Sequence, residues 1–143
     1  MKRLVLFIVL SLLVCAGEAS AKRLAVSAGR ANVRSGPGTN HEVLWSVGKY
    51  YPFDVLKKSG RWYKIRDFEG DAGWMHGSLL RQIPAVIVKA RLANVREKPG
   101  TNFRILLHAE RGVCFKRVGQ KGKWFKVRHA DGEMGWIHKS LVW

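Results

Sequence analysis

The distribution of apolar and polar residues along the chain predicts short β-strands. Apolar side chains alternate with polar ones over short stretches bounded by turn residues, and no stretch has the spacing of a helical face. We expect strands at 24–34, 43–47, 52–58, 61–67 and 72–76, and again at 86–96, 105–109, 113–118, 123–129 and 134–138. The fold class is therefore predicted to be all-β.

Turn residues stand where these strands are expected to reverse direction. Gly36-Pro37-Gly38 predicts a loop, since glycine supplies positive φ and proline removes a ladder donor. Ser59-Gly60 and Lys121-Gly122 stand at the expected tips of hairpins. Short antiparallel strands within about 60 residues bury a common apolar face by curling into a small barrel.

The same pattern of residues occurs twice in the chain, 62 positions apart and without a gap. The run Ala31-Asn32-Val33-Arg34 returns as Ala93-Asn94-Val95-Arg96, and Gly73-Trp74 returns as Gly135-Trp136. We therefore expect two tandem copies of one module, at 22–82 and 85–143. The connector between them is short and contains Ile83 and Pro84, which predicts that the two barrels touch.

The first residues have the organisation of a secretory signal peptide. Lys2-Arg3 precedes an apolar run from 4 to 14, and small residues end at Ala21. We predict cleavage after residue 21 and a periplasmic or secreted protein without a transmembrane segment, because the run is too short to span a bilayer. Acylation of Cys15 is the disfavoured alternative, since Val14 precedes it.

Charge narrows the choice of partners. The chain carries 26 basic and 10 acidic residues, a formal charge of +16 at pH 7. Such a surplus concentrates polyanions around a protein. For an exported protein these are acidic cell-envelope polymers, and export argues against nucleic acid as the partner. The alternative is that Lys and Arg merely solvate two small barrels.

The repeated residues resemble the bacterial SH3 (SH3b) domain. The resemblance lies in Ala-Asn-Val-Arg-x-x-Pro-Gly-Thr-Asn, then Gly-x-Trp-aromatic-Lys-aliphatic-Arg, then Gly-x-x-Gly-Trp-x-His-x-Ser-Leu, each present in both copies. It implies two tandem small SH3-like β-barrels. It also implies a binding module, since family members often attach a neighbouring hydrolase to peptidoglycan. No catalytic domain accompanies the two copies in this sequence, which weakens the idea of targeting.

Strand parity places a candidate site on the outer face of each barrel. Tyr63 and Ile65 alternate with Trp62, Lys64 and Arg66, so the first pair should face the core and the other three should face outwards. The second copy repeats the outward set as Trp124, Lys126 and Arg128. An indole flanked by cations suits a peptide that carries carboxylates. By resemblance, the first aromatic residue of this strand lies in the ligand groove of SH3 domains. The alternative is that each Trp closes the barrel side beneath Lys and Arg stems.

His76 and His138 complete the predicted site. An imidazole can make binding sensitive to pH, and a structural hydrogen bond to a loop carbonyl explains a repeated His as well. We expect no metal site, because each copy offers one such His without a second His or Cys at ligand spacing. We also expect Asn32 to hold the Pro-Gly loop and Arg34 to be available to an anion.

The sequence contains no complete set of catalytic residues of a known type. Cys114 has no counterpart in the first copy, where Pro52 stands, and no Gly-x-Ser-x-Gly or His-Glu-x-x-His segment is present. We expect an inert, half-buried thiol, no cofactor and no enzymatic activity. The leading hypothesis is a monomeric, exported binding protein that holds peptidoglycan stem peptides or another acidic envelope polymer. The alternative is a protein-interaction module that docks a partner's peptide or edge strand.

Overall fold

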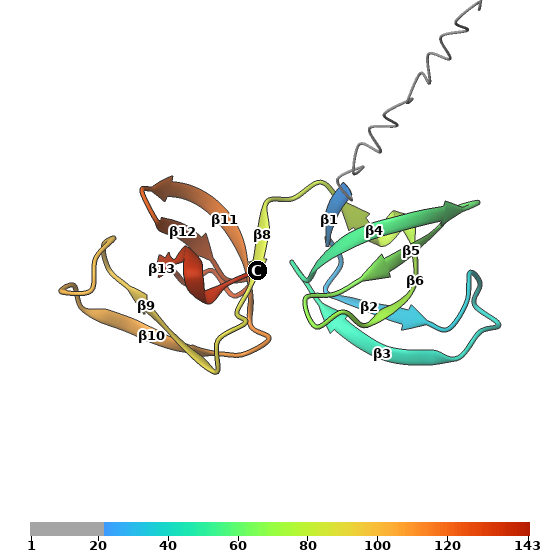
Figure 1. The fold of residues 1–143 in the computed structure, drawn as a ribbon, viewed down its shortest axis with the longest axis horizontal. Coiled ribbons are helices and arrows are strands. Elements are labelled where there is room, and N and C mark those ends of the chain that lie inside the picture. Colours follow the sequence, from blue (N-terminus) through green and yellow to red (C-terminus); the bar gives the residue numbers. More distant parts are fainter. Residues whose placement is uncertain (1–21) are drawn as a thin grey trace, which may run out of the picture.

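The computed structural model describes residues 22–143, and within this range the chain forms two β-sheets, one after the other. Figure 1 shows them as two curled bodies side by side, joined by the segment that leads into β8 (Ala85–Ile87). The predicted all-β class and tandem SH3-like barrels are confirmed. The predicted signal peptide and Cys15 lie outside the described residues. Within the described part of the chain no helix is long and apolar enough to cross a membrane.

The first barrel is one antiparallel sheet in the order β3-β2-β6-β5-β4-β1-β7. Its strands are β1 (Lys22–Val26), β2 (Arg30–Arg34), β3 (Val43–Gly48), β4 (Pro52–Ser59), β5 (Trp62–Arg66), β6 (Ala72–His76) and β7 (Leu80–Arg81). A 3₁₀ turn, η1 (Gly77–Leu79), joins β6 to β7.

The second barrel repeats this arrangement in the order β10-β9-β13-β12-β11-β8. Besides β8 it contains β9 (Leu92–Arg96), β10 (Ile105–Glu110), β11 (Cys114–Lys121), β12 (Trp124–Arg128), β13 (Met134–His138) and the 3₁₀ turn η2 (Lys139–Leu141). An isolated bridge between Val88 and Val142 closes this sheet after η2.

The long strands expected at 24–34 and 86–96 are each two strands, so that expectation was wrong. In the first copy a bend at 27–29 separates β1 from β2. Strand β1 pairs with β4 and β7, whereas β2 pairs with β3 and β6. The chain therefore changes partners at the bend, which lets one sheet curl around a single core. The buried apolar positions change parity at the bend, from Leu24 and Val26 to Ala31 and Val33, and a single continuous strand does not allow this change.

The hairpins reverse at the expected glycines. Gly60 has φ of 58° and Gly122 has φ of 57°, a left-handed conformation that L-residues rarely adopt. They connect β4 to β5 and β11 to β12. Strands β5 and β12 carry most of the predicted site residues. These turns therefore set the register that brings Trp62 and Trp124 to their positions.

Each barrel has its own apolar core, arranged as strand parity predicts. Ile65 and Phe53 are fully buried in the first barrel, and Val127 and Phe115 are buried at the matching positions of the second. The side chain of Tyr63 packs against the first core from its margin. The alternate residues of β5 therefore face outwards, and the predicted site lies on the outer face of the barrel.

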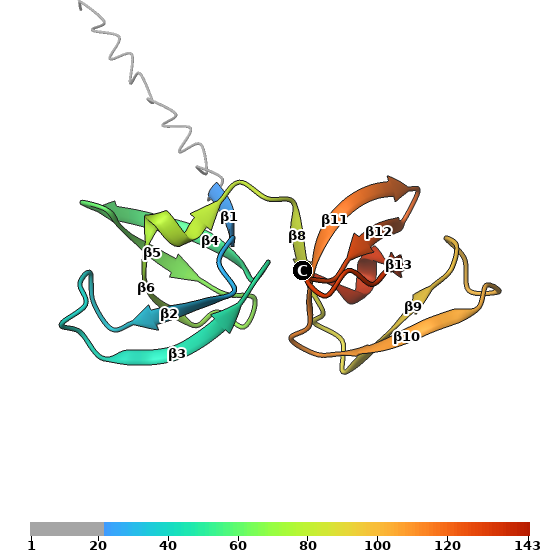
Figure 2. The same cartoon turned by 180° about the vertical axis from the view of Figure 1, so that it is seen from behind.

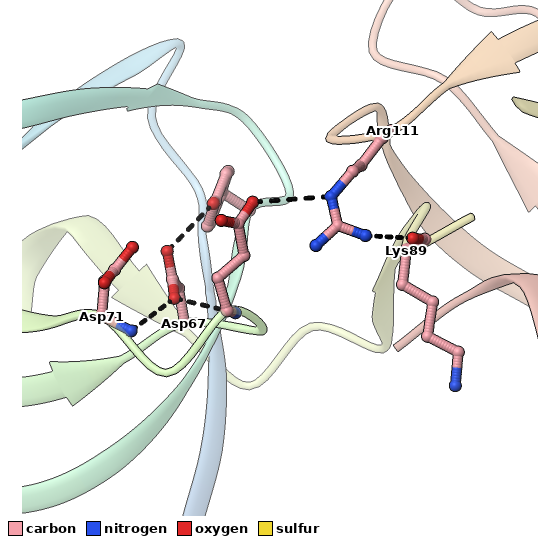
Figure 3. Close-up of polar contacts among 6 residues, drawn as sticks. Asp67, Asp71, Lys89 and Arg111 are labelled. Atoms are coloured by element: carbon pink, nitrogen blue, oxygen red, sulfur yellow. Dashed lines mark hydrogen bonds and ion pairs between the residues drawn. The ribbon is translucent and has the colours of Figure 1, made fainter. Parts of the chain in front are cut away.

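The two barrels touch, as the short connector predicts. Arg111, at the end of β10, lies with its Nε 3.7 Å from Glu69 Oε1 and with its guanidinium 4.9 Å from the centre of the Phe68 ring. Figure 3 shows this arginine reaching across from the second barrel to the loop between β5 and β6 while it also donates to the carbonyl of Lys89. One guanidinium therefore bridges a loop of each barrel.

A buried carboxylate shapes the loop that Arg111 meets. Asp67 Oδ1 accepts hydrogen bonds from the backbone N–H groups of Glu69 at 3.0 Å and Asp71 at 2.9 Å (Figure 3). The hydroxyl of Tyr51 donates to its Oδ2 at 3.4 Å. These bonds satisfy the one buried charged side chain among the described residues. They also present Glu69 to the neighbouring barrel.

Candidate functional site

A groove on the first barrel is built around two aromatic rings. Trp62 of β5 stands directly opposite His76 of β6 in the strand register. Their ring centres are 5.3 Å apart and the planes meet at 88°, an edge-to-face arrangement. The groove has a volume of about 350 Å³, and we call it the Trp62 groove. It is lined by Arg30, Ala31, Asn32, Arg34, Thr39, Trp62, His76 and Leu79.

His76 is held in place as a cap. It precedes η1, and its Nδ1 accepts a hydrogen bond from the backbone N–H of Ser78 at 3.2 Å and lies 2.6 Å from Ser78 Oγ. Because Nδ1 accepts, the proton of the neutral ring lies on Nε2. The expected partner was a loop carbonyl, whereas the actual partner is a backbone N–H. The cap fixes the ring that stands against Trp62.

The Pro-Gly loop is held by Arg34 and not, as expected, by Asn32. Arg34 Nη1 donates to the carbonyls of Thr39 at 3.1 Å and His41 at 3.0 Å, so the arginine holds the Pro-Gly loop. Asn32 Oδ1 accepts from Ser46 Oγ at 2.7 Å, across to β3. A guanidinium has five N–H donors and these two bonds use Nη1 alone. Arg34 can therefore hold the loop and still present its other nitrogens to the groove that it lines.

Lys64 and Arg66 lie further along the same outer face and do not line the Trp62 groove. In the strand register Lys64 stands opposite Trp74, and Arg66 stands opposite Asp54 on the other side. Arg66 Nη2 is 3.6 Å from Asp54 Oδ2, in an ion pair whose arginine is exposed and whose aspartate is partly buried. Of the four residues predicted in this copy, the structure brings Trp62 and His76 together in one groove. A ligand role for all four remains a prediction.

Arg30 of the groove was not predicted from the sequence, whereas Arg34 was expected to be available to an anion. Residues 30, 32 and 34 alternate along β2, so all three side chains lie on one face of the strand. Strand β2 lies beside β6, which carries His76. Parity within β2 was therefore the signal for Arg30, but the pairing of β2 with β6 could not be inferred from the local pattern.

The second barrel repeats the aromatic pair. Trp124 and His138 have ring centres 5.2 Å apart with planes at 90°, and His138 Nδ1 accepts from the backbone N–H of Ser140 at 3.2 Å. Lys126 and Arg128 lie further along β12, as Lys64 and Arg66 lie along β5. The edge-to-face pair of Trp and His is therefore common to both copies of the module.

The surroundings of the two aromatic pairs differ. Leu92, 51% exposed, stands where the first copy has Arg30, and His108 stands where it has Ser46. Lys116 replaces Asp54, so Arg128 faces a cation across the strands where Arg66 faces an anion. The second site is therefore more apolar beside its Trp and more basic along its outer face.

Cys114 is partly buried in the cavity between the barrels. Burial raises the pKa of its thiol to about 12, and its Sγ donates to the carbonyl of Gly112 at 3.5 Å. A thiol in this state stays protonated at neutral pH and is a poor nucleophile. The described residues contain no group of three or more His, Cys, Asp or Glu side chains that could hold a metal ion.

The chain is similar in sequence to parts of two proteins that are named as amidases. It is 23% identical over 122 residues to YrvJ of Bacillus subtilis, which is named as an N-acetylmuramoyl-L-alanine amidase; the match covers 78% of this chain and 23% of YrvJ. It is 37% identical over 46 residues to LytH of Staphylococcus epidermidis, named as a cell wall amidase, covering 32% of this chain and 16% of LytH. The chain thus spans less than a quarter of YrvJ and of LytH.

Solved structures with some similarity include an NlpC/P60 family protein from Bacillus cereus. That match is 13% identical with a TM-score of 0.41 and covers 85% of this chain and 56% of the other. NlpC2 from Trichomonas vaginalis is 12% identical with a TM-score of 0.37, covering 87% and 48%. Similarity at this level does not bear on function.

Family membership follows from the sequence of both barrels. The model of the bacterial SH3 domain matches residues 27–82 and again residues 89–143. The two matches fall on the two sheets that the structure shows. The chain therefore belongs to the bacterial SH3 domain family.

Proposed function

We propose that the protein is an exported, non-catalytic binding protein that holds peptidoglycan stem peptides. The observation that carries the proposal is the Trp62 groove, where His76, the cap of η1, stands against an indole beside the guanidinium groups of Arg30 and Arg34. An indole offers an amphipathic platform for a peptide backbone. The guanidinium groups offer planar forks for its carboxylates.

The overall charge supports an acidic ligand. A formal charge of +16 at pH 7 raises the local concentration of a polyanion and speeds its encounter with either barrel. The Pro-Gly loops after β2 and β9 lie at opposite outer ends of the molecule in both views (Figures 1 and 2), and Thr39 of the first loop lines the Trp62 groove. A polymer with repeated acidic peptides can engage both ends at once, which raises avidity even where each site is weak.

The relatives support the envelope as the place of action. YrvJ and LytH are named as amidases, LytH as a cell wall amidase, and this chain matches part of each. The location that we propose is the periplasm or the outside of the cell. The ligand that we propose, an acidic stem peptide of the wall, is found there.

The proposal includes the absence of catalysis. Cys114 and His129 line the same cavity between the barrels, a pairing that a thiol hydrolase would need. The raised pKa of the thiol argues against a nucleophile at this position. Incubation with purified sacculi should release no new amino groups or soluble fragments. Release that depends on Cys114 would contradict this part of the proposal.

A sacculus pull-down tests the binding site. The wild-type chain should sediment with purified sacculi, and the double variant Trp62→Ala/Trp124→Ala should remain in the supernatant. The matched control is Lys58→Ala/Gln120→Ala, which changes an exposed residue at one repeated position outside the groove. Retention of the tryptophan variant would remove the proposed site.

A second candidate function rests on the edges of the two sheets. Strands β3 and β10 end their sheets, and Figure 2 shows both along the lower rims of the barrels. Val43 and Leu44 on β3, and Ile105 and Leu106 on β10, are exposed. An extended peptide of a partner protein could add to such an edge. Salt distinguishes the two functions, because binding through charge weakens steeply with ionic strength and apolar edge pairing does not.

A further inference from the structure

Another groove lies between the barrels, apart from both aromatic sites and from the cavity that Cys114 lines. It has a volume of about 360 Å³, and we call it the inter-barrel groove. The connector forms one wall through Ile83 and Pro84, and Val86 and Val142 of the second barrel add apolar surface. The remaining lining residues are Arg23, Gln82, Ala85, Arg117, Phe125 and Trp143. The groove is thus apolar along its walls and carries two arginines.

Each of these arginines is held on an aromatic face. The guanidinium of Arg23, in the first barrel, lies 3.8 Å from the centre of the Trp143 indole in the second. The guanidinium of Arg117 lies 5.0 Å from the centre of the Phe125 ring. Stacking on a ring restrains a guanidinium while its in-plane N–H donors stay free to bind an anion. The two cations are therefore preorganised.

Neither arginine of this pair forms an ion pair among the described residues. Within residues 22–143 neither guanidinium has a carboxylate within 4.0 Å; Asp54, which stands opposite Arg23 in the strand register, pairs with Arg66 instead. Burial lowers the pKa of Arg23, Asp54 acts in the opposite direction, and the positive charge of Arg117 lowers it further. Two like charges against apolar walls create a site that an anion stabilises.

The arginine pair belongs to the tandem and not to the module. At the positions 62 residues apart, Arg23 corresponds to Ala85, Val55 to Arg117, and Arg81 to Trp143. Neither barrel alone contains the arrangement, because Arg23 comes from one and its aromatic partner Trp143 from the other. The inter-barrel groove therefore exists only when both copies are joined.

We propose that the inter-barrel groove binds the C-terminal carboxylate of a peptide whose last residue is apolar. Arg23 and Arg117 hold the two carboxylate oxygens, and the last side chain lies against Ile83 and Val142. A C-terminal residue suits this groove because it carries both a carboxylate and a side chain on one Cα, so both fit a cavity of about 360 Å³. Phosphate, which is strongly hydrated, would leave the apolar wall unused.

The experiment titrates the isotope-labelled full chain with acetyl-glycyl-glycyl-leucine that has a free carboxylate. The indole N–H signal of Trp143, assigned with Trp143→Phe, and the guanidinium signals of Arg23 and Arg117 should shift. The same tripeptide as an amide should bind at least about tenfold more weakly, which corresponds to the loss of one charged hydrogen bond. Arg23→Gln/Arg117→Gln should show an equal loss for the acid form.

The control is Arg61→Gln/Lys123→Gln, which removes two exposed charges at one repeated position and leaves the groove intact. This variant should bind the acid tripeptide as the wild type does. In Trp62→Ala/Trp124→Ala the Trp143 indole signal should shift with the tripeptide as it does in the wild type, so loss of the aromatic sites is distinguished from loss of this groove. Equal binding of acid and amide, equal binding of inorganic phosphate, or no shift at millimolar peptide would each overturn the proposal.

Discussion

The rings of Trp62 and His76 stand edge to face, with centres 5.3 Å apart and planes at 88°, and Nδ1 of His76 caps the 3₁₀ turn that follows β6. The second barrel repeats this relationship with Trp124 and His138 at 5.2 Å and 90°. One imidazole therefore supports both the fold and the candidate site. The two roles can be separated by substitution.

His76→Asn should separate them. Asparagine is a good cap, so it can accept the hydrogen bond from Ser78, and His76→Asn should lose only the contact with the Trp62 ring, about 0.5 to 1.5 kcal/mol. His76→Ala removes the cap as well and should cost about 1 kcal/mol more. Urea denaturation measures both. Because each variant removes the ring that fixes Trp62, sacculus binding by the first barrel should fall in both, and normal binding by His76→Asn would show that the ring is not needed.

Arg34→Lys should loosen the Pro-Gly loop. A lysine cannot bond to the carbonyls of Thr39 and His41 with the geometry of a planar guanidinium, so the loop loses an anchor worth about 1 kcal/mol. We expect faster amide exchange at Ser35 and His41. Arg30→Lys is the control, because Arg30 lines the same groove without a hydrogen bond to this loop among those of the described residues. Equal exchange in both variants would contradict the assigned role.

Glu69→Gln should widen the range of barrel orientations without unfolding either barrel. The Arg111–Glu69 pair is exposed on both sides, and such pairs contribute about 0 to 1 kcal/mol. The melting temperature should therefore change little, whereas residual dipolar couplings should show larger relative motion of the barrels. Glu97→Gln breaks the ion pair with Arg104 inside the second barrel and should leave the couplings unchanged. Identical couplings in both variants would show that Glu69 does not restrain the barrels.

Cys114 should make stability fall at high pH. Burial raises its pKa from 9.0 to about 12, so between these values the folded chain keeps a proton that the unfolded chain loses. The contribution of this thiol to stability is therefore complete below about pH 9 and declines as the pH rises towards about 12. Cys114→Ser lacks this decline. The free energies of unfolding of the wild type and of Cys114→Ser, measured from about pH 9 to about pH 12, show the decline as a changing difference. A difference that stays constant would mean that the thiol is not shielded.

Local sequence information was sufficient for the modules and for the outward face of β5. Glycine at 60 and 122 specifies the hairpin reversal, and alternation within the strand separates Ile65 from Trp62. These features depend on neighbours in the chain, so they can be recognised without knowing the fold. The break between β1 and β2 was not predicted, although the buried apolar positions change parity there, from Leu24 and Val26 to Ala31 and Val33.

By itself the sequence determined a duplicated all-β chain of high positive charge, since repetition, alternation and composition are written residue by residue. The tertiary structure decided which side chains lie together at each site. Pairing of β2 with β6 brought Arg30 and Arg34 to the Trp62 groove, and contact between the barrels brought Arg23 to Trp143. The physical reason is that these neighbours are joined by strand pairing and packing between distant segments, which local periodicity does not encode.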